Sequence, residues 1–350
     1  MTTTIALDGM GGDHAPRIVV AGAELARTRL RDTRFLLFGD EAKLTPLLAA
    51  HPALPAIATV RHTPDSVAAD AKPSIALRQG RNSSMRLAIN AVRDGEAQAA
   101  VSAGNTGALM AMAKFVLKTL PGIDRPAIAA VLPTRRRPSV VLDLGANVDC
   151  TAENLLQFAV MGEVFARCIL GVERPEIGLL NIGTEDVKGD EVVRGAANLI
   201  RESGLPMQFK GFVEGTDVLE GMADVVVTDG FTGNVALKIA EGTAQMYASF
   251  LREAFSSSLR GKLGYLIARP VLDRLRTRLD PRRYNGAMFL GLSGIVVKSH
   301  GGTDEEGFAN AIGVAEGLVR SRANERIIEE IGAVGALSPL EAGEPRAAVS

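Results

Sequence analysis

The sequence predicts an α/β protein of three layers (α/β/α), with helices on both faces of a largely parallel sheet. Short apolar runs alternate with longer helical patterns along the chain, as in parallel sheets whose strands are joined by crossover helices. The 350 residues are 47% hydrophobic, which is enough for one large core or two ordinary ones. The 37 glycines and few aromatic residues are typical of an enzyme with many tight turns between strands and helices.

The periodicity of apolar residues predicts where these elements lie. The predicted strands are residues 4–7, 34–38, 56–62, 97–102, 127–132, 139–142, 176–181, 207–213, 225–228 and 294–298. The predicted helices are residues 17–31, 74–93, 106–119, 152–170, 191–203, 234–258 and 305–331. Many of the strands end in Gly, Asp or Asn, where the amides of the next helix can receive an anion.

The chain shows no internal repeat and no low-complexity linker. We therefore expect a single catalytic domain over residues 1–335, with two lobes. Residues 336–350, with Ala, Glu and Pro, are expected to form a flexible tail.

One segment, residues 252–283, has a different charge from the rest of the chain. It holds nine basic and three acidic residues, a charge of about +6 inside a chain of −1. Leu251, Phe255, Leu259 and Leu263 recur every four residues and form one apolar stripe. This pattern, interrupted by Pro270, predicts a projecting basic amphipathic helical hairpin. Its surface would suit an acidic carrier protein or anionic lipid; a solvated face beside a dimer contact is the alternative.

The composition and the absence of several motifs exclude some classes of function. A net charge of −1 and a pI near 6.5 argue against a nucleic-acid binder. No run approaches the roughly 20 apolar residues of a membrane span, and no secretory signal is visible, so we expect a cytoplasmic protein. Cys150 and Cys168 stand apart, and no metal-ligand spacing or P-loop occurs. We therefore expect neither a metal nor a cofactor.

Two glycine-rich loops in the first third of the chain could bind a ligand. Asp8-Gly-Met-Gly-Gly-Asp13-His14 follows the first strand; His14 stands where a dinucleotide fingerprint needs glycine. Ser102-Ala-Gly104-Asn105-Thr106-Gly107 precedes a helix, so its amides could receive a phosphate or a developing oxyanion. N-capping by Asn105 is the structural alternative.

The second loop also fits another class of enzyme. Ala100-Val-Ser102-Ala-Gly104 resembles the G-x-S-x-G nucleophile elbow of serine hydrolases, with Ala in the first position. A later Asp and His300 would complete the chain order Ser, Asp, His. A thioesterase or other serine hydrolase that uses Ser102 therefore remains an alternative, although no HGGG-type oxyanion segment precedes it.

Two later strand ends carry further polar groups. Asn147 follows the strand that ends at 142. In Gly183-Thr-Glu185-Asp-Val-Lys188, spacing of three places Glu185 and Lys188 on one side of a helical turn. A lysine beside the start of a helix adds positive charge to the positive end of the helix dipole, so it is favourable there only if an anion binds. This favours Lys188 as a phosphate ligand over a surface ion pair.

The most concentrated polar loops lie after residue 223. Asp229-Gly-Phe-Thr-Gly233-Asn234 links a buried strand to a long helix. Near the C-terminus, Lys298-Ser-His300-Gly-Gly follows another strand and adds an ammonium group and an imidazole. A lone histidine is often structural, but one beside Lys, Ser and two glycines is a better site candidate.

Taken together, these loops resemble the PlsX family, the bacterial acyl-carrier-protein:phosphate acyltransferases. The resemblance covers residues 5 to about 320. It is carried by MGGD (10–13), NSSM (82–85), SAGNTGALM (102–110), GIDRPA (122–127), DLGANVD (143–149), GLLNIGTED (178–186) with Lys188-Gly189, DVVVTDGFTGNVALK (224–238) and KSHG (298–301).

The resemblance implies a fold similar to the isocitrate and isopropylmalate dehydrogenases and to phosphotransacetylases, in a homodimer. It implies transfer of a fatty acyl group from an acyl-carrier-protein thioester to inorganic phosphate, giving acyl-phosphate for phospholipid synthesis. It also implies a peripheral tie to the inner face of the cell membrane, where a glycerol-phosphate acyltransferase would use the product.

The mechanism expected from this resemblance has no covalent enzyme intermediate, because phosphate is itself a nucleophile that needs positioning. Lys188 and the amides of the Ser102–Gly107 loop would hold phosphate. Asn234, Lys298 or His300 would stabilise the oxyanion or protonate the thiolate, and Asp229 would orient one of these donors. The predicted substrate-binding residues are Asp13, Ser102, Gly104, Asn105, Thr106, Asn147, Gly183, Glu185 and Gly233.

Two further alternatives stay open from the sequence. A dehydrogenase on the same fold would need nicotinamide, and a noncatalytic membrane scaffold would leave the polar loops without a purpose.

Overall fold

The structure is a computed structural model that describes residues 2–278 and 280–337. In this part of the chain, eleven strands form one sheet in the order β3-β2-β1-β4-β11-β10-β5-β6-β9-β7-β8. The strands are β1 (Thr3–Asp8), β2 (Thr33–Gly39), β3 (Ala58–His62), β4 (Ala99–Ser102), β5 (Ala127–Leu132), β6 (Ser139–Leu142), β7 (Glu176–Leu180), β8 (Gln208–Val213), β9 (Val225–Val227), β10 (Ala287–Leu290) and β11 (Ile295–Lys298).

The sheet consists of two parallel blocks that run in opposite directions. The first block is β3, β2, β1, β4 and β11, and the second block is β6, β9, β7 and β8. Between them, β10 is antiparallel to both β11 and β5, and β5 is antiparallel to β6. The carboxyl ends of the two blocks therefore lie at opposite edges of the sheet.

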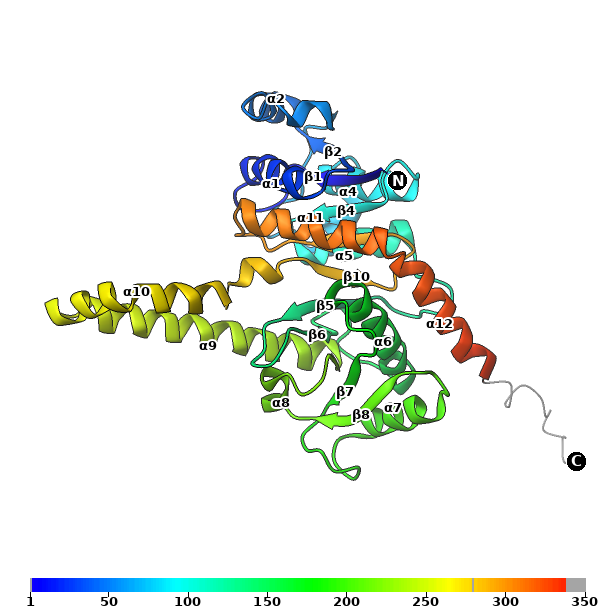
Figure 1. The fold of residues 1–350 in the computed structure, drawn as a ribbon. Helices are drawn as coiled ribbons and strands as arrows, with labels where there is room; N and C mark the ends of the chain where they lie inside the picture. The colour runs from blue at the N-terminus through cyan, green and yellow to red at the C-terminus, as the bar shows by residue number, and fades with distance from the viewer. Residues whose placement is uncertain (1, 279, 338–350) are drawn as a thin grey trace, which may run out of the picture.

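Helices cover both faces, as the alternation of buried side chains requires. On β1, Ile5 and Leu7 pack into one hydrophobic cluster and Ala6 into the other. Helices α1, α6, α7, α11 and α12 bury side chains in the first cluster, and α3, α4 and α5 in the second. Figure 1 shows α1 and α11 side by side over the first block.

The helical elements are bounded as follows. They are α1 (Arg17–Arg29), α2 (Glu41–Ala49), η1 (Leu54–Ala56), α3 (Pro73–Gln79), α4 (Ser84–Arg93), α5 (Thr106–Leu117), α6 (Ala152–Phe165), η2 (Ala166–Leu170), α7 (Glu191–Glu202), α8 (Gly215–Glu220), α9 (Gly230–Ser256), α10 (Leu259–Arg278), η3 (Pro281–Tyr284), α11 (Glu305–Arg320) and α12 (Ala323–Leu337).

The predicted fold class is confirmed, and each predicted strand occurs. The strand β10 was not predicted, because its four residues stand between Gly286 and Gly291, both at positive φ. The predicted helix 74–93 is two helices, since α3 ends at Gly80 and Ser83 caps α4. The predicted helix 305–331 is likewise divided, at Arg322 with φ 54°. The predicted tail lies outside the described residues from 338 onward.

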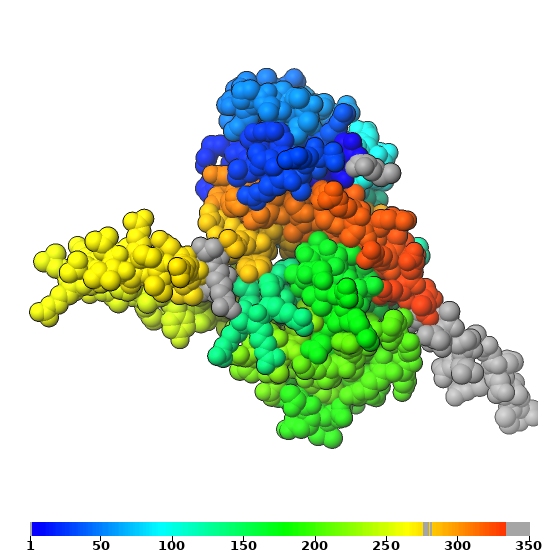
Figure 2. Space-filling model, in the orientation of Figure 1, coloured from blue at the N-terminus to red at the C-terminus, as the bar shows by residue number. Residues whose placement is uncertain are grey.

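Helices α9 and α10 form an antiparallel hairpin that projects from the body (Figures 1 and 2). The projection was predicted for residues 252–283, but it begins earlier, within α9. The turn lies at Ser257 and Ser258, and the Phe255 and Tyr265 rings meet edge to face with centroids 5.6 Å apart. Pro270 lies inside α10 and does not interrupt it, contrary to the prediction. No helix among the described residues is long and apolar enough to cross a membrane.

Candidate functional site

A buried carboxylate, Asp8, is the centre of a first polar cluster at the carboxyl ends of β1, β4 and β11. Its Oδ1 accepts a hydrogen bond from Ser84 Oγ at 2.6 Å, and its Oδ2 accepts one from Ser102 Oγ at 2.6 Å. Burial raises the pKa of Asp8, and the two serine hydroxyls act in the opposite direction. Parallel pairing of β4 with β1 and β11 brings these groups together.

Lys298 supplies the positive charge of this first cluster. It ends β11 opposite Ser102 and is only 9% exposed. Its Nζ donates to the carbonyl oxygens of Ala103, at 3.4 Å, and Ser299. Within the described residues, no carboxylate oxygen lies within ion-pair distance of it. Burial lowers the pKa of Lys298 to about 8, against the weaker opposing effect of Asp8 and Asp13.

Glycines let two loops close over this cluster. A Cβ atom at Gly11 would lie 2.3 Å from Asp8 Oδ2 and 2.8 Å from the Gly104 amide nitrogen. Gly12 has φ +105°, a conformation that favours glycine. The Gly104 amide donates to Ser102 Oγ at 3.0 Å. Both loops therefore depend on glycine at these positions.

The first turn of α5 opens at the same edge. Asn105 caps it: Oδ1 accepts from the Ala108 amide at 2.9 Å, and Nδ2 donates to the Ala69 and Ala71 carbonyls. N-capping, the alternative role predicted for Asn105, therefore accounts for its contacts, and both the oxygen and the nitrogen of its side-chain amide form hydrogen bonds. The amides of Thr106 and Gly107 have no acceptor among the described residues, as is usual for a first turn. They can receive an anion.

The His300 loop is held beside the Gly11–Asp13 loop. The Asp13 amide donates to the Gly301 carbonyl at 2.9 Å, and His300 Nδ1 accepts from the Gly302 amide at 3.2 Å. His300 is exposed, and its amide donates to Asn285 Oδ1 at 2.9 Å. Asn285 Nδ2 donates to Ser299, Thr303 and Gly307. Asn285 was not predicted as a site residue, because it precedes the unpredicted strand β10.

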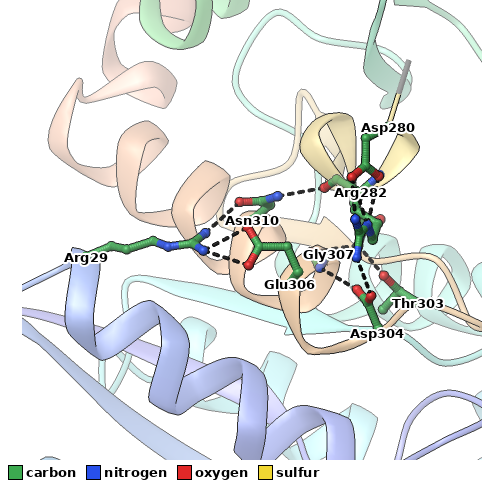
Figure 3. A network of polar contacts seen from close by, with 9 residues as sticks. Arg29, Asp280, Arg282, Thr303, Asp304, Glu306, Gly307 and Asn310 are labelled. Atoms are coloured by element: carbon green, nitrogen blue, oxygen red, sulfur yellow. Dashed lines mark hydrogen bonds and ion pairs between the residues drawn. The ribbon is translucent and has the colours of Figure 1, made fainter. Parts of the chain in front are cut away.

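A polar network joins the base of the hairpin to the helix that follows the His300 loop (Figure 3). Arg282 is paired with Asp280 and, through Nη1, with Asp304 at 2.9 Å. Asp304 in turn caps α11, and Arg29 of α1 binds Glu306 and Asn310 in its first turns. The hydrogen bonds from Arg282 keep the pKa of Asp280 low. The hairpin base is therefore fixed to the elements that carry the first cluster.

A second buried carboxylate, Asp143, organises a polar cluster at the carboxyl end of β6. It accepts hydrogen bonds from the amides of Ile128, Gly145, Ala146 and Asn147, at 2.7–3.1 Å, and from Asn147 Nδ2. Burial raises its pKa, while these donors act to lower it. Asn147 Nδ2 also donates to the Pro126 carbonyl, so this predicted substrate-binding amide is held inside the protein.

The start of α9 packs directly on this second cluster. Gly230 donates to the Asn147 carbonyl at 2.7 Å, and a Cβ at Gly233 would lie 2.0 Å from the Asp143 carbonyl oxygen. Asp229 caps the helix by accepting from the Thr232 amide at 2.8 Å, which is a structural role. Asn234 is exposed beside Gly145. Of the side chains predicted here, that of Asn234 is the exposed one.

The Lys188 loop lies beside this second cluster, after β7. Asn181 closes the loop by donating to the Lys188 carbonyl at 3.2 Å, and the Lys188 amide donates to the Glu185 carbonyl. A Cβ at Gly183 would lie 2.7 Å from Glu185 Oε2. Lys188 is exposed, and its side chain has no ion-pair partner among the described residues, so the surface pair with Glu185 is not formed. Lys188 is thus available to an anion.

The structure does not bring the predicted phosphate ligands together within one chain. Ser102 ends β4 and Lys188 follows β7, six strands further along the sheet and at the opposite edge. At about 4.8 Å per strand this is roughly 29 Å, far more than one phosphate can bridge. Within one chain, Lys188 and the Ser102–Gly107 loop are therefore too far apart to hold the same phosphate. Asp13, Lys298 and His300 lie in the first cluster; Asn147, Asp229 and Asn234 in the second.

The geometry around Ser102 does not resemble a nucleophile elbow. Its hydroxyl is buried and donates to Asp8, with no histidine in between. His300 Nδ1 accepts from a backbone amide. A serine hydrolase needs the hydroxyl bonded to its general base. Ser102 instead holds the Asp8 carboxylate in place.

Comparison with known proteins decides the family. A family model described as "Fatty acid synthesis protein" matches residues 3–326. The chain belongs to this family, the PlsX family. It is 62% identical over 341 residues to the phosphate acyltransferase of Rhodospirillum centenum, covering 97% of this chain and 96% of that protein. It is 54% identical to that of Parvibaculum lavamentivorans, over 97% and 94% of the two chains. The PlsX-family chain is accordingly a phosphate acyltransferase.

Solved structures with similar folds support the architecture alone. A phosphotransacetylase from Streptococcus pyogenes has a TM-score of 0.63 at 18% identity, covering 91% of this chain and 94% of that one. A 4-hydroxythreonine-4-phosphate dehydrogenase from Klebsiella pneumoniae has a TM-score of 0.54 at 16% identity, covering 91% and 100%. The expected likeness to phosphotransacetylases is therefore confirmed.

The buried Lys298 predicts a specific pH dependence of stability. Its pKa is about 8 in the folded chain and near 10.5 when unfolded. Below pH 8 the ammonium group is charged in both states, and its burial costs stability in full. Between pH 8 and 10.5 the folded chain releases the proton while the unfolded chain keeps it. The free energy of unfolding should therefore rise by roughly 2–3 kcal/mol relative to Lys298→Met across this window.

Urea unfolding of both proteins at several pH values between 7 and 10.5 measures this difference. A difference in the free energy of unfolding between the wild type and Lys298→Met that stays constant over the whole pH window would contradict the lowered pKa of Lys298.

Proposed function

We propose that this phosphate acyltransferase moves a fatty acyl group from the thioester of an acyl carrier protein to inorganic phosphate. Acyl-phosphate, a precursor for phosphatidic acid, would be the product. The observation that carries the proposal is the unpaired Lys298 ammonium group beside the open first turn of α5. A buried charge without a counterion is costly, and an anion that enters beside it relieves that cost. Phosphate supplies such an anion.

The proposed reaction is a direct displacement. A phosphate oxygen attacks the thioester carbonyl, the C–O bond forms as the C–S bond breaks, and the thiolate leaves and takes up a proton. The amides of Thr106 and Gly107 and the Lys298 ammonium group would orient phosphate and oppose the developing negative charge. The Lys298 ammonium group is one candidate to give the thiolate its proton. His300 is the other candidate donor.

A homodimer would place the first polar cluster of one copy next to the second polar cluster of the other. The surface around Lys188 and the base of α9 carries exposed apolar side chains: Val148, Ile182, Val187, Phe231, Val235 and Ile239. Such patches mark protein or ligand contacts. In our proposal a second copy packs on this surface and brings its Lys188 and Asn234 to the first cluster. The acyl chain would lie along the exposed apolar side chains of α9, such as Phe231 and Val235, with the dimer interface as one wall.

The hairpin is proposed to make peripheral contact with the membrane. Leu259, Leu263, Leu266 and Ile267 are exposed on α10, among basic residues that include Arg260 and Lys262. This combination suits a surface of anionic lipid. The acyl-phosphate would thereby be released near a membrane-bound glycerol-phosphate acyltransferase.

Dependence on phosphate tests the reaction. Thiol release from a long-chain acyl carrier protein should require inorganic phosphate, and phosphorus-31 NMR should show an equal amount of acyl-phosphate. Hydrolysis of the thioester at the same rate without phosphate, giving free fatty acid, would refute the proposal.

Complementation tests the shared site. Lys188→Ala and Lys298→Met should each lower turnover at least tenfold, because each removes a cation that binds phosphate. Lys238→Ala is the matched control, since Lys238 is exposed on α9 and paired with Glu241.

Co-expression of the two inactive variants should restore about a quarter of wild-type turnover, since half of the dimers would each carry one intact site. A mixture no more active than its components would refute the shared site.

A further inference from the structure

The body of the protein carries a second basic surface, distinct from the hairpin, on α3, α4 and α5. Residues 71–93 and 97–123 contain no Asp or Glu but seven basic residues: Lys72, Arg78, Arg81, Arg86, Arg93, Lys114 and Lys118. Arg93 is paired with Asp94 at 2.7 Å. The other six have no ion-pair partner among the described residues. This surface, which we call the α3–α5 surface, therefore has a local excess of positive charge.

An exposed aromatic ring lies at the centre of the α3–α5 surface. Phe115, on α5, is 55% exposed. The Arg86 Cζ atom lies 5.3 Å and the Lys118 Nζ atom 5.0 Å from the centre of its ring. These contacts hold two cations around an apolar side chain. Arg86 is buried and bonded through Nε to Asn90, so its position is fixed. A charged rim around an exposed aromatic anchor is typical of a protein-binding surface.

The backbone of Lys118 supports a role for its side chain. Its φ of 63° and ψ of 178° fall in a region that glycine adopts freely and other residues rarely adopt. Its carbonyl accepts from Ser293 at 3.0 Å, which helps to fix this conformation. Glycine would be the more stable residue at this turn. The position of the ammonium group over Phe115 gives lysine a reason to be there.

The α3–α5 surface is one helix away from the first polar cluster. Asn105 caps α5 at that cluster, and Phe115 and Lys118 lie at the other end of the helix. The 12 residues of α5 span about 18 Å. A donor whose acyl group is carried on a long flexible arm must dock its protein part at such a distance from the reacting carbon. The hairpin, in contrast, projects away from the body (Figure 2).

We propose that the acyl carrier protein docks on the α3–α5 surface, with its acidic face against Arg81, Lys114 and Lys118 and an apolar side chain on Phe115. The inference rests on the proposed function, because it takes the donor to be an acidic carrier protein. It assigns the two basic surfaces to different partners: the carrier protein binds α3–α5, and lipid binds the hairpin.

Charge reversal tests the assignment. The triple variant Arg81→Glu/Lys114→Glu/Lys118→Glu should raise KM for the acyl carrier protein at least tenfold and weaken its dependence on salt. KM for phosphate, and turnover of the same acyl group on pantetheine alone, should stay as in the wild type. The control variant Arg260→Glu/Lys262→Glu on the hairpin should keep the wild-type KM for the carrier protein and lose binding to anionic vesicles. The reverse pattern of the two variants would overturn the assignment.

Lys118→Gly separates docking from folding. The variant should raise the melting temperature by about 2 °C, since the strained residue is removed, and still raise KM for the carrier protein severalfold. An unchanged KM would remove Lys118 from the interface.

Direct binding of carrier protein without an acyl group distinguishes a failure of the docking proposal from a failure of the proposed function. Binding by the wild type that is lost in the triple variant supports docking even if phosphate-dependent transfer is not observed, in which case the proposed function alone fails. Equal binding by the wild type and the triple variant would refute the docking surface and leave the proposed function standing.

Discussion

The first block depends on how a carboxylate and an ammonium group are kept out of water at the ends of three adjacent strands. Asp8 and Lys298 are both buried, and either group alone would cost considerable stability. Ser84 and Ser102 satisfy the carboxylate, and two backbone carbonyls satisfy the ammonium group. The glycines of the flanking loops are required because any Cβ atom would displace these contacts. The positive charge of Lys298 is left for a ligand.

The opposite directions of the two strand blocks are the second constraint. They separate Lys188 and Asn234 from the Lys298 cluster by most of the width of the sheet. A reaction that uses both sets of residues therefore needs two copies of the chain. The exposed apolar residues around Lys188 are consistent with a surface that is covered in such an assembly. In our proposal the partners also divide by surface, with phosphate at strand ends, the carrier protein on α3–α5 and lipid on the hairpin.

The sequence predicted most of the strands because most of them are short apolar runs that are buried in the sheet. It also placed the polar loops correctly at strand ends. It could not predict the direction of the second block, which is set by the antiparallel pairing of β5 with β6, because the apolar pattern of a strand does not show which way it runs relative to its neighbour. Asp8 and Asp143 were passed over as site residues, although each ends a strand and precedes glycine within a few residues. Asn105 was predicted to contact a ligand and Asp229 to orient a donor, but both side chains cap helices, a role that the same sequence pattern also allows.

The most direct test of this account is the titration of the Lys298 side chain by NMR, with and without inorganic phosphate. Without phosphate, the pKa of Lys298 should be about 8, as burial dictates. Saturation with phosphate should raise this pKa toward the ordinary 10.5, because the dianion stabilises the ammonium form. A pKa of Lys298 that does not move when phosphate saturates the protein would contradict the claim that this buried charge binds the nucleophile.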